Sequence, residues 1–324
     1  MKEFFIKNKY LVLIVLFIIL NIFVSYFYIG YSPKLEQDAA DYLQAAEYLS
    51  RGGSGEISIL ALLHRMLTNP AFIYLSIFIN YFLNDFSSSF AIVNVFFYSL
   101  LLFAFYFLTL EIYKEKKVAF FSSILVVFNY YIIDPSMAHL SDMGGWFFFI
   151  FSTYWAVKYF NTSNRKFYYL SILIAAIGVL FQEYGGLVMV NLVFLILFSN
   201  LSNKQKIKDI IRAGLLASLP LLLYYAFFYL TYHLTYFDRI ASAALIDSFG
   251  NETNDLISLI KILGWLFTFG WLAFCFGLKK EWAVMDKHRI KILLATFPIT
   301  LLFLIWPSYT QRIAVVLMMW LSLI

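Results

Sequence analysis

Long apolar runs alternate with short polar connections along almost the whole chain. The first run covers residues 10–30 and follows three lysines. A helix of about 20 apolar residues spans a bilayer, so runs of this length predict membrane-crossing helices. Further runs lie at roughly 88–112, 118–133, 143–160, 167–182, 185–199, 213–233, 257–278, 291–307 and 313–324. We therefore expect an all-α polytopic membrane protein with about ten transmembrane helices.

Two segments fit this pattern less simply. Residues 70–83 are apolar, but about 14 residues reach only about 21 Å as a helix, so we expect a helix lying in the outer interface or a re-entrant helix. Residues 167–199 barely supply two crossings. The apex at residues 181–186 should therefore be drawn down to the membrane boundary, with Glu183 half-buried.

Composition and charge support a membrane protein and predict its orientation. The chain is 62% hydrophobic and 13% charged, which excludes a soluble catalytic domain and a nucleic-acid-binding domain. Basic residues cluster on every second connection. A cytoplasmic N-terminus leaves only six of the 24 Lys and Arg residues outside, as the positive-inside rule requires. We expect one domain over residues 1–324, multi-pass in the plasma (inner) membrane.

The first outer connection holds the clearest local signal. Residues 37–50 have helical spacing, with an apolar stripe at Tyr42, Ala45, Ala46 and Leu49, and glycines follow directly. Asp38 and Asp41 share one face near the N-terminus of this helix, where acids also compensate the helix dipole. Residues 31–87 are thus predicted to form an outer loop with amphipathic and interfacial helices.

This loop resembles the first outer loop of GT-C glycosyltransferases. The resemblance is carried by Asp38-x-x-x-Tyr42-x-x-x-Ala46-x-x-Leu49 followed by Gly52-Gly53. It continues through a series of short motifs: Pro70, Ala91-Ile-Val-Asn94, Lys117-Val-Ala, Leu140-Ser-Asp142 and Gly185-Gly186.

The resemblance implies a GT-C-like fold and a sugar donor linked to a polyprenyl phosphate, as in protein O-mannosyltransferases and lipid A aminoarabinose transferases. The acceptor would be a lipid-linked glycan, a polysaccharide or a protein, and membrane lipid is the other partner. The chain has Asp38-Ala39 where the O-mannosyltransferases have an Asp-Glu pair, and Asn69-Pro70 where an Arg-Pro or His-Pro is usual. Sugar and acceptor therefore stay open.

On this resemblance, acids and cations on the outer side take different roles. Asp38 is the candidate general base on the acceptor hydroxyl, with Asp41 as its charged neighbour or substitute. The departing lipid phosphate needs cations. The candidates are His64, Arg65, Arg239, Lys261 and Arg312, although an interfacial Arg is also a common membrane anchor.

Two further acids, Asp142 and Glu183, are candidates for the functional site. Asp142 would orient the acceptor or hold a divalent ion together with Asp38, but it equally suits the N-cap of its helix. Glu183 is a candidate because a carboxylate inside a membrane is costly, and a hydrogen bond to a neighbouring helix is the alternative explanation. No set of His and Cys residues has metal-ligand spacing, and His288 falls in a basic inner connection where we expect it to be solvated.

Two other functions stay open on the sequence. A transporter or flippase of lipid-linked sugars would also need a polar cavity among helices, but it should show inverted repeats and charges near the midplane. A non-catalytic GT-C-like scaffold would keep the fold and lack the chemistry. The clustering of acids on one face favours the transferase.

Overall fold

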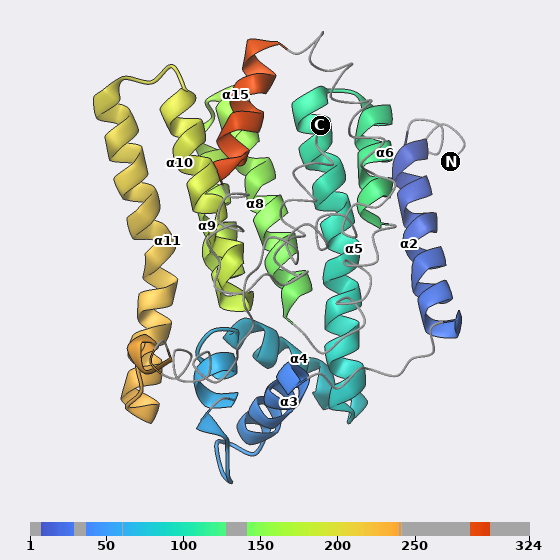
Figure 1. The fold of residues 1–324 in the computed structure, drawn as a ribbon, viewed down its shortest axis with the longest axis vertical. Helices are drawn as coiled ribbons and strands as arrows, with labels where there is room; N and C mark the ends of the chain where they lie inside the picture. Colours follow the sequence, from blue (N-terminus) through green and yellow to red (C-terminus); the bar gives the residue numbers. More distant parts are fainter. Residues whose placement is uncertain are drawn as a thin grey trace, which may run out of the picture.

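The computed structural model describes residues 8–28, 37–59, 61–127, 141–239, 241 and 286–298. Every regular element in these ranges is a helix, which confirms the all-α prediction for this part of the chain (Figure 1). The predicted spans 257–278 and 313–324 lie outside the described residues, as do most of 291–307, Lys261, Arg312 and the side chain of Asp38.

Seven helices lie side by side in alternating directions (Figure 1). Each coincides with one of the apolar runs in the sequence. They are α2 (Lys9–Tyr28), α5 (Phe86–Tyr113), α6 (Lys116–Val127), α8 (Asp142–Thr162), α9 (Arg165–Phe181), α10 (Val188–Phe198) and α11 (Asn203–Tyr232). A shorter helix, α15 (Lys287–Thr296), packs against α10.

The two ends of this bundle differ in charge. The end next to α15, here called the α15 end, carries the basic connections at 114–117, 165–166 and 204–212 (Figure 1). The opposite end, here called the α3 end, is covered by the helices of the first long connection. Most basic residues of the described part of the chain thus lie at the α15 end, as the alternation of basic connections along the sequence predicts.

The start of α11 differs from the prediction. The apolar run begins near residue 213, but the helix begins at Asn203 and includes the basic residues 204–212. Ser202 is its N-cap, and its hydroxyl accepts a hydrogen bond from the backbone N–H of Gln205. The cap formed by Ser202 and the burial of Asp209 against α9 both extend the helix beyond its apolar run.

Two of the described helices, Phe86–Tyr113 and Asn203–Tyr232, are long and apolar enough to cross a membrane. Most of α5 is buried among its neighbours, whereas α11 exposes a row of large apolar side chains that includes Leu219, Leu222, Leu223 and Leu230. Soluble proteins rarely expose so much continuous apolar surface, so this face indicates association with a membrane.

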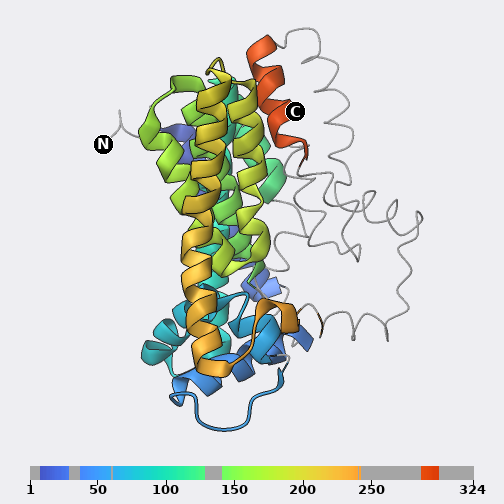
Figure 2. The same ribbon diagram turned by 90° about the vertical axis from the view of Figure 1, so that its left-hand side faces the viewer.

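The α3 end is built from α3 (Gln37–Ser50), the π-helix η1 (Ala61–Met66), α4 (Pro70–Leu83) and the 3₁₀ turn η2 (Glu183–Gly186). The bounds of α3 and α4 match the predicted helices. Tyr42, Ala45 and Ala46 are buried, as the predicted stripe requires. Figure 2 shows residues 236–239, which follow α11, at this same end. Five separate parts of the chain therefore meet there.

Candidate functional site

Arg65 and Asp41 form an ion pair at the α3 end. Arg65 lies on η1, and its Nε is 3.8 Å from Oδ2 of Asp41 on α3. The guanidinium also lies over the ring of Tyr42, 4.9 Å from the ring centroid. The two charged side chains are 17% and 19% exposed, so the pair is mostly buried and partly open to solvent.

A hydrogen bond between Tyr42 and Ser141 ties α3 to the beginning of α8. The hydroxyl oxygens are 2.6 Å apart, and both residues are buried. Ser141 is the N-cap of α8, so Asp142 occupies the first helical position instead of the N-cap. The structure thus does not support the capping role for Asp142.

The carboxylate of Asp142 is buried and accepts a hydrogen bond from the turn η2. The hydroxyl of Tyr184 donates to Oδ1 of Asp142 at 2.5 Å, and the Tyr184 ring stacks on Trp146 at 6.2 Å. Asp142 is only 3% exposed. This hydrogen bond joins α8 to η2, the turn that also carries Glu183.

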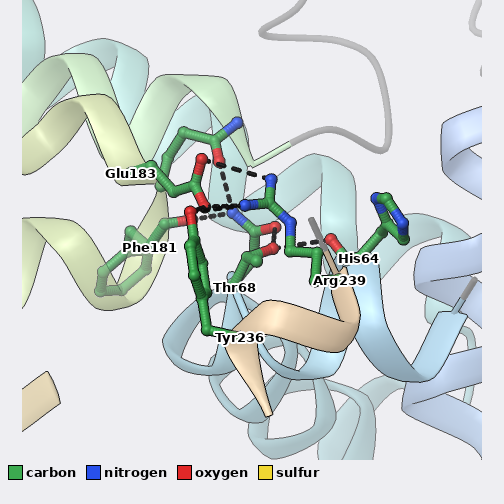
Figure 3. Close-up of polar contacts among 8 residues, drawn as sticks. His64, Thr68, Phe181, Glu183, Tyr236 and Arg239 are labelled. Carbon is green, nitrogen blue, oxygen red and sulfur yellow. Dashed lines mark hydrogen bonds and ion pairs between the residues drawn. The ribbon is translucent and has the colours of Figure 1, made fainter. Parts of the chain in front are cut away.

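Glu183 and Arg239 form the second ion pair of this end (Figure 3). Nη1 of Arg239 donates to Oε1 of Glu183, and Nη2 lies 3.3 Å from Oε2. Tyr236 completes the group, since its hydroxyl donates to Oε1 of Glu183 at 2.8 Å and accepts from Nη1 of Arg239 at 2.7 Å. Burial, followed by the charge of Glu183, raises the pKa of the Tyr236 phenol, which therefore stays protonated as a donor.

The exposure of this pair matches the prediction for Glu183. Glu183 and Arg239 are 26% and 22% exposed, so the carboxylate is half-buried at the apex between α9 and α10. The sequence offered Arg239 as a cation for a lipid phosphate and Glu183 as a buried acid. The structure brings these two candidates together.

Asn69 connects η1 to the apex between α9 and α10. Its Nδ2 donates to the carbonyl of Phe181 at 2.8 Å and to Oε1 of Gln182 at 2.6 Å, while its Oδ1 accepts from Thr68 (Figure 3). The imidazole of His64 points away from the pair of Glu183 and Arg239 in this view. Asn69 lies four residues after Arg65, and its partners Phe181 and Gln182 directly precede Glu183. These hydrogen bonds thus fix the position of Arg65 relative to Glu183.

Glycine allows the apex to pack closely against α8 and α9. A Cβ on Gly145 would lie 2.6 Å from Cβ of Gln182 and from Cε2 of Tyr184. A Cβ on Gly185 would lie 2.6 Å from the backbone carbon and oxygen of Gly178. Any larger residue would push the apex, and with it Tyr184 and Glu183, away from Asp142.

Sequence reasoning missed several residues of this site. Tyr42 was assigned to the apolar stripe, yet its hydroxyl and ring bind Ser141 and Arg65. Tyr184 lies in the apex motif, and Asn69 precedes Pro70, so both motifs contained a signal. Tyr236 carried no signal, because only the fold brings it to Glu183.

Some of the predicted site lies outside the described residues. Asp38 belongs to the backbone range of α3, but its side chain is outside the description, and Arg312 is outside it entirely. Within the described part of the chain, no group of three or more His, Cys, Asp or Glu residues could hold a metal ion. The suggested ion between Asp38 and Asp142 therefore stays a prediction.

The arrangement offers two guanidinium groups that each face a carboxylate and remain partly open to solvent. Arg binds carboxylate and phosphate with the same planar donor geometry, so a phosphate can take the place of a carboxylate oxygen. No protein family matches the chain, and no curated protein is significantly similar to it. The resemblance to GT-C enzymes therefore remains one of motifs and their order.

Proposed function

We propose that the chain is a membrane glycosyltransferase that moves a sugar from a polyprenyl-phosphate donor to a lipid-linked glycan, a polysaccharide or a protein. One observation carries the proposal. Predicted acids and cations from α3, η1, α8, η2 and the segment after α11 meet at the α3 end, opposite the basic connections. This placement is what an enzyme with an outward-facing site needs.

The proposal includes about ten spans in the plasma (inner) membrane with both termini in the cytoplasm. The basic connections at the α15 end would then face the cytoplasm, and the α3 end would face outward. An outward site meets lipid-borne donors that are presented on the outer leaflet. The seven alternating helices support this topology because each reverses the direction of the one before.

Arg65 and Arg239 would hold the phosphate of the donor. In the free protein, Asp41 and Glu183 keep these guanidinium groups in place. Phosphate binding would replace part of each ion pair with a charge-assisted contact of similar geometry. The charge that develops on the departing lipid phosphate is then stabilised by groups that are already oriented.

Asp38 would act as general base on the acceptor hydroxyl. It lies one turn before Asp41 and Tyr42 in α3, the helix that carries the first ion pair. Asp41 faces Arg65, which makes it better suited to hold the cation than to accept a proton. Asp142, buried at the start of α8 and bonded to Tyr184, would orient the acceptor side of the site.

The proposal is tested by sugar transfer in membranes that contain the full chain and a labelled polyprenyl-phosphate sugar. Loss of a general base lowers the rate by about 10²–10⁴, so Asp38→Asn should nearly abolish transfer while Asp41→Asn reduces it less. Normal sugar transfer by Asp38→Asn would show that Asp38 is not the general base. Absence of transfer by the unmodified chain with every donor would favour the scaffold or the flippase.

The cations are tested by donor binding. Arg65→Gln and Arg239→Gln should each weaken donor binding by about 1.5–3 kcal/mol, the range for hydrogen bonds to charged groups. Arg51→Gln is the matched control, because Arg51 lies at the same end but is 67% exposed and pairs only with Glu47 in α3. If all three variants weaken donor binding equally, the arginines attract the donor only through general surface charge and do not bind its phosphate.

The orientation is tested separately by labelling. Single cysteines at Ser54, Ser163 and Ser202, all exposed positions, are placed in a Cys275→Ser background. An impermeant thiol reagent added outside intact cells should label the cysteine at position 54 and leave the other two unmodified. The opposite labelling would overturn the outward-facing site.

A further inference from the structure

A cavity of about 240 Å³ lies at the α15 end, between α8, α10 and α15. Its lining combines aromatic side chains, among them Phe160 and Phe198, with the polar side chains of Asn200, His288 and Lys291. The cavity is far from the α3-end site and takes no part in the transfer proposed above. Ligand pockets for drug-sized molecules are about 300–1,000 Å³, so this one suits a smaller group.

The ring of His288 is held at the cavity by two contacts. Nδ2 of Asn161 donates to Oε1 of Glu111 at 2.7 Å, which fixes the orientation of the Asn161 amide. Oδ1 of Asn161 must then accept from Nε2 of His288, which lies 2.7 Å away. The ring also stacks on Phe160 with centroids 5.0 Å apart. His288 is exposed, as expected, but its ring is positioned, and Nδ1 is the acceptor nitrogen of the singly protonated ring when Nε2 donates to Asn161.

The electrostatics of the cavity favour an anion. The ends of α8 and α10 each bring about half a negative charge. Lys206 offsets one of them by donating from Nζ to the carbonyl of Leu197 at 2.7 Å. Lys291 in the lining adds a full positive charge. Three nearby basic residues are instead each paired with an acid, namely Lys114, Arg165 and Arg289. The full charge of Lys291 outweighs the remaining half charge of the helix end.

The surroundings of the cavity point to a lipid as the source of this anion. Leu197 on α10 and Leu294 on α15 are 45% and 52% exposed, and they lie within one turn of the lining residues Phe198 and Lys291. Acyl chains can run along such side chains while the head group enters the cavity. Basic pockets between membrane helices at the cytoplasmic side are a general type of site for anionic lipid head groups.

We infer that this cavity binds the phosphate head group of an anionic membrane lipid. Lys291 supplies the charge, Asn200 supplies a polar contact, His288 borders the cavity, and Phe160 and Phe198 close the apolar side. Such a lipid would hold α15 against α8 and α10. The inference rests on the proposed membrane topology, in which the α15 end faces the cytoplasm, but not on the sugar transfer itself.

The test measures binding of fluorescent phosphatidylglycerol to the purified full chain in neutral detergent micelles, with phosphatidylcholine as the uncharged comparison. Lys291→Gln should weaken phosphatidylglycerol binding about five-fold, the factor that corresponds to about 1 kcal/mol per basic residue. Asn200→Trp should weaken it at least as much by filling the cavity without changing any charge. Lys287→Gln is the matched control, since Lys287 is exposed on the same helix outside the lining.

Three results would overturn the inference. Equal loss in Lys287→Gln and Lys291→Gln would show that diffuse charge attracts the lipid. Unchanged binding in Asn200→Trp would place the lipid outside the cavity. Full competition by glycerol 3-phosphate at concentrations comparable to the lipid would reassign the cavity to a soluble phosphate ester. Unchanged thermal unfolding of the variants without lipid confirms that they are folded.

Discussion

Charged groups lie at both ends of the bundle, but the two ends hold them differently. At the α15 end, Asp209 is fully buried and accepts from Nη1 of Arg165 at 2.6 Å and from Nε2 of Gln205 at 2.7 Å. At the α3 end, Asp41 and Glu183 are 19% and 26% exposed and each faces one arginine. The carboxylate of Asp209 is closed to water although its partner Arg165 is 39% exposed, whereas the carboxylates of Asp41 and Glu183 are open to water.

The partners also differ in where they lie in the fold. Arg165 and Asp209 belong to the neighbouring bundle helices α9 and α11. Arg65 and Arg239 belong to segments outside the long helices, namely η1 and the short helical segment 236–239 after α11. A pair whose carboxylate is buried between packed helices stabilises the fold, whereas a pair with a partly exposed carboxylate on short segments can exchange one partner for a ligand. The comparison therefore favours the α3 end over the α15 end as the place of the proposed transfer site.

The largest expected effect is on stability at the α15 end. Arg165→Met leaves Asp209 charged and buried, and removal of one partner of a buried pair costs about 3–5 kcal/mol. Arg239→Met should cost clearly less, because the half-exposed Glu183 can be hydrated. Chemical unfolding in mixed micelles measures both, with Lys166→Met as an exposed control next to Arg165. Equal losses in the two arginine variants would break the comparison.

A second prediction concerns the packing of the apex. Gly185→Ala places a Cβ 2.6 Å from the backbone of Gly178, and overpacking of this kind costs about 1–3 kcal/mol. The same substitution should also weaken donor binding, because it moves Glu183 away from Arg239. Gly214→Ala is the control: its Cβ meets nothing within 4 Å, and alanine gains about 0.5–1 kcal/mol in a helix interior. A stable, active Gly185→Ala variant would contradict the close packing.

A third prediction compares two ion pairs at the same end. A double-mutant cycle of Glu183→Gln and Arg239→Gln should give a coupling energy in the lower part of the range of about 0.5–3 kcal/mol for networked pairs. The same cycle on Glu47 and Arg51, which are 49% and 67% exposed, should give about 0.3–0.5 kcal/mol. Unfolding free energies of the single and double variants supply both values. If the coupling energy of Glu183 and Arg239 is no larger than that of Glu47 and Arg51, the first pair is an ordinary surface ion pair.

The smallest expected effect is the acid sensitivity of two capping carboxylates, one at each end. Hydrogen bonds from the hydroxyl and backbone N–H of Thr235 lower the pKa of Asp238, and the backbone N–H of Arg289 lowers that of Asp286. Each acid therefore contributes stability above its ordinary pKa of about 4, and the contribution is lost as the pH falls through the lowered value.

Thermal unfolding as a function of pH measures this effect. Asp238→Asn and Asp286→Asn should each lower the midpoint slightly at neutral pH and leave it unchanged at a pH below both pKa values. The two ends should respond alike, since both acids are exposed caps. A difference that persists in strong acid would assign the effect to packing and not to the charge.

The sequence predicted the helices well because helix formation depends on local properties. Apolar runs of sufficient length and the glycines after Ser50 mark helix positions without reference to the rest of the chain. The start of α11 was misplaced because its first turns are polar, and their burial against α9 depends on Arg165.

The site was predicted as a set of residues, and only the tertiary structure decided their partners. Glu183 and Arg239 are 56 residues apart, and Tyr42 and Ser141 are 99 apart. Charge and position relative to the apolar runs identified Asp41, Arg65, Asp142, Glu183 and Arg239 as candidates at one end. A side chain's partner depends on which segments the packed helices bring within about 3 Å of one another, and that distance is not a local property of the sequence.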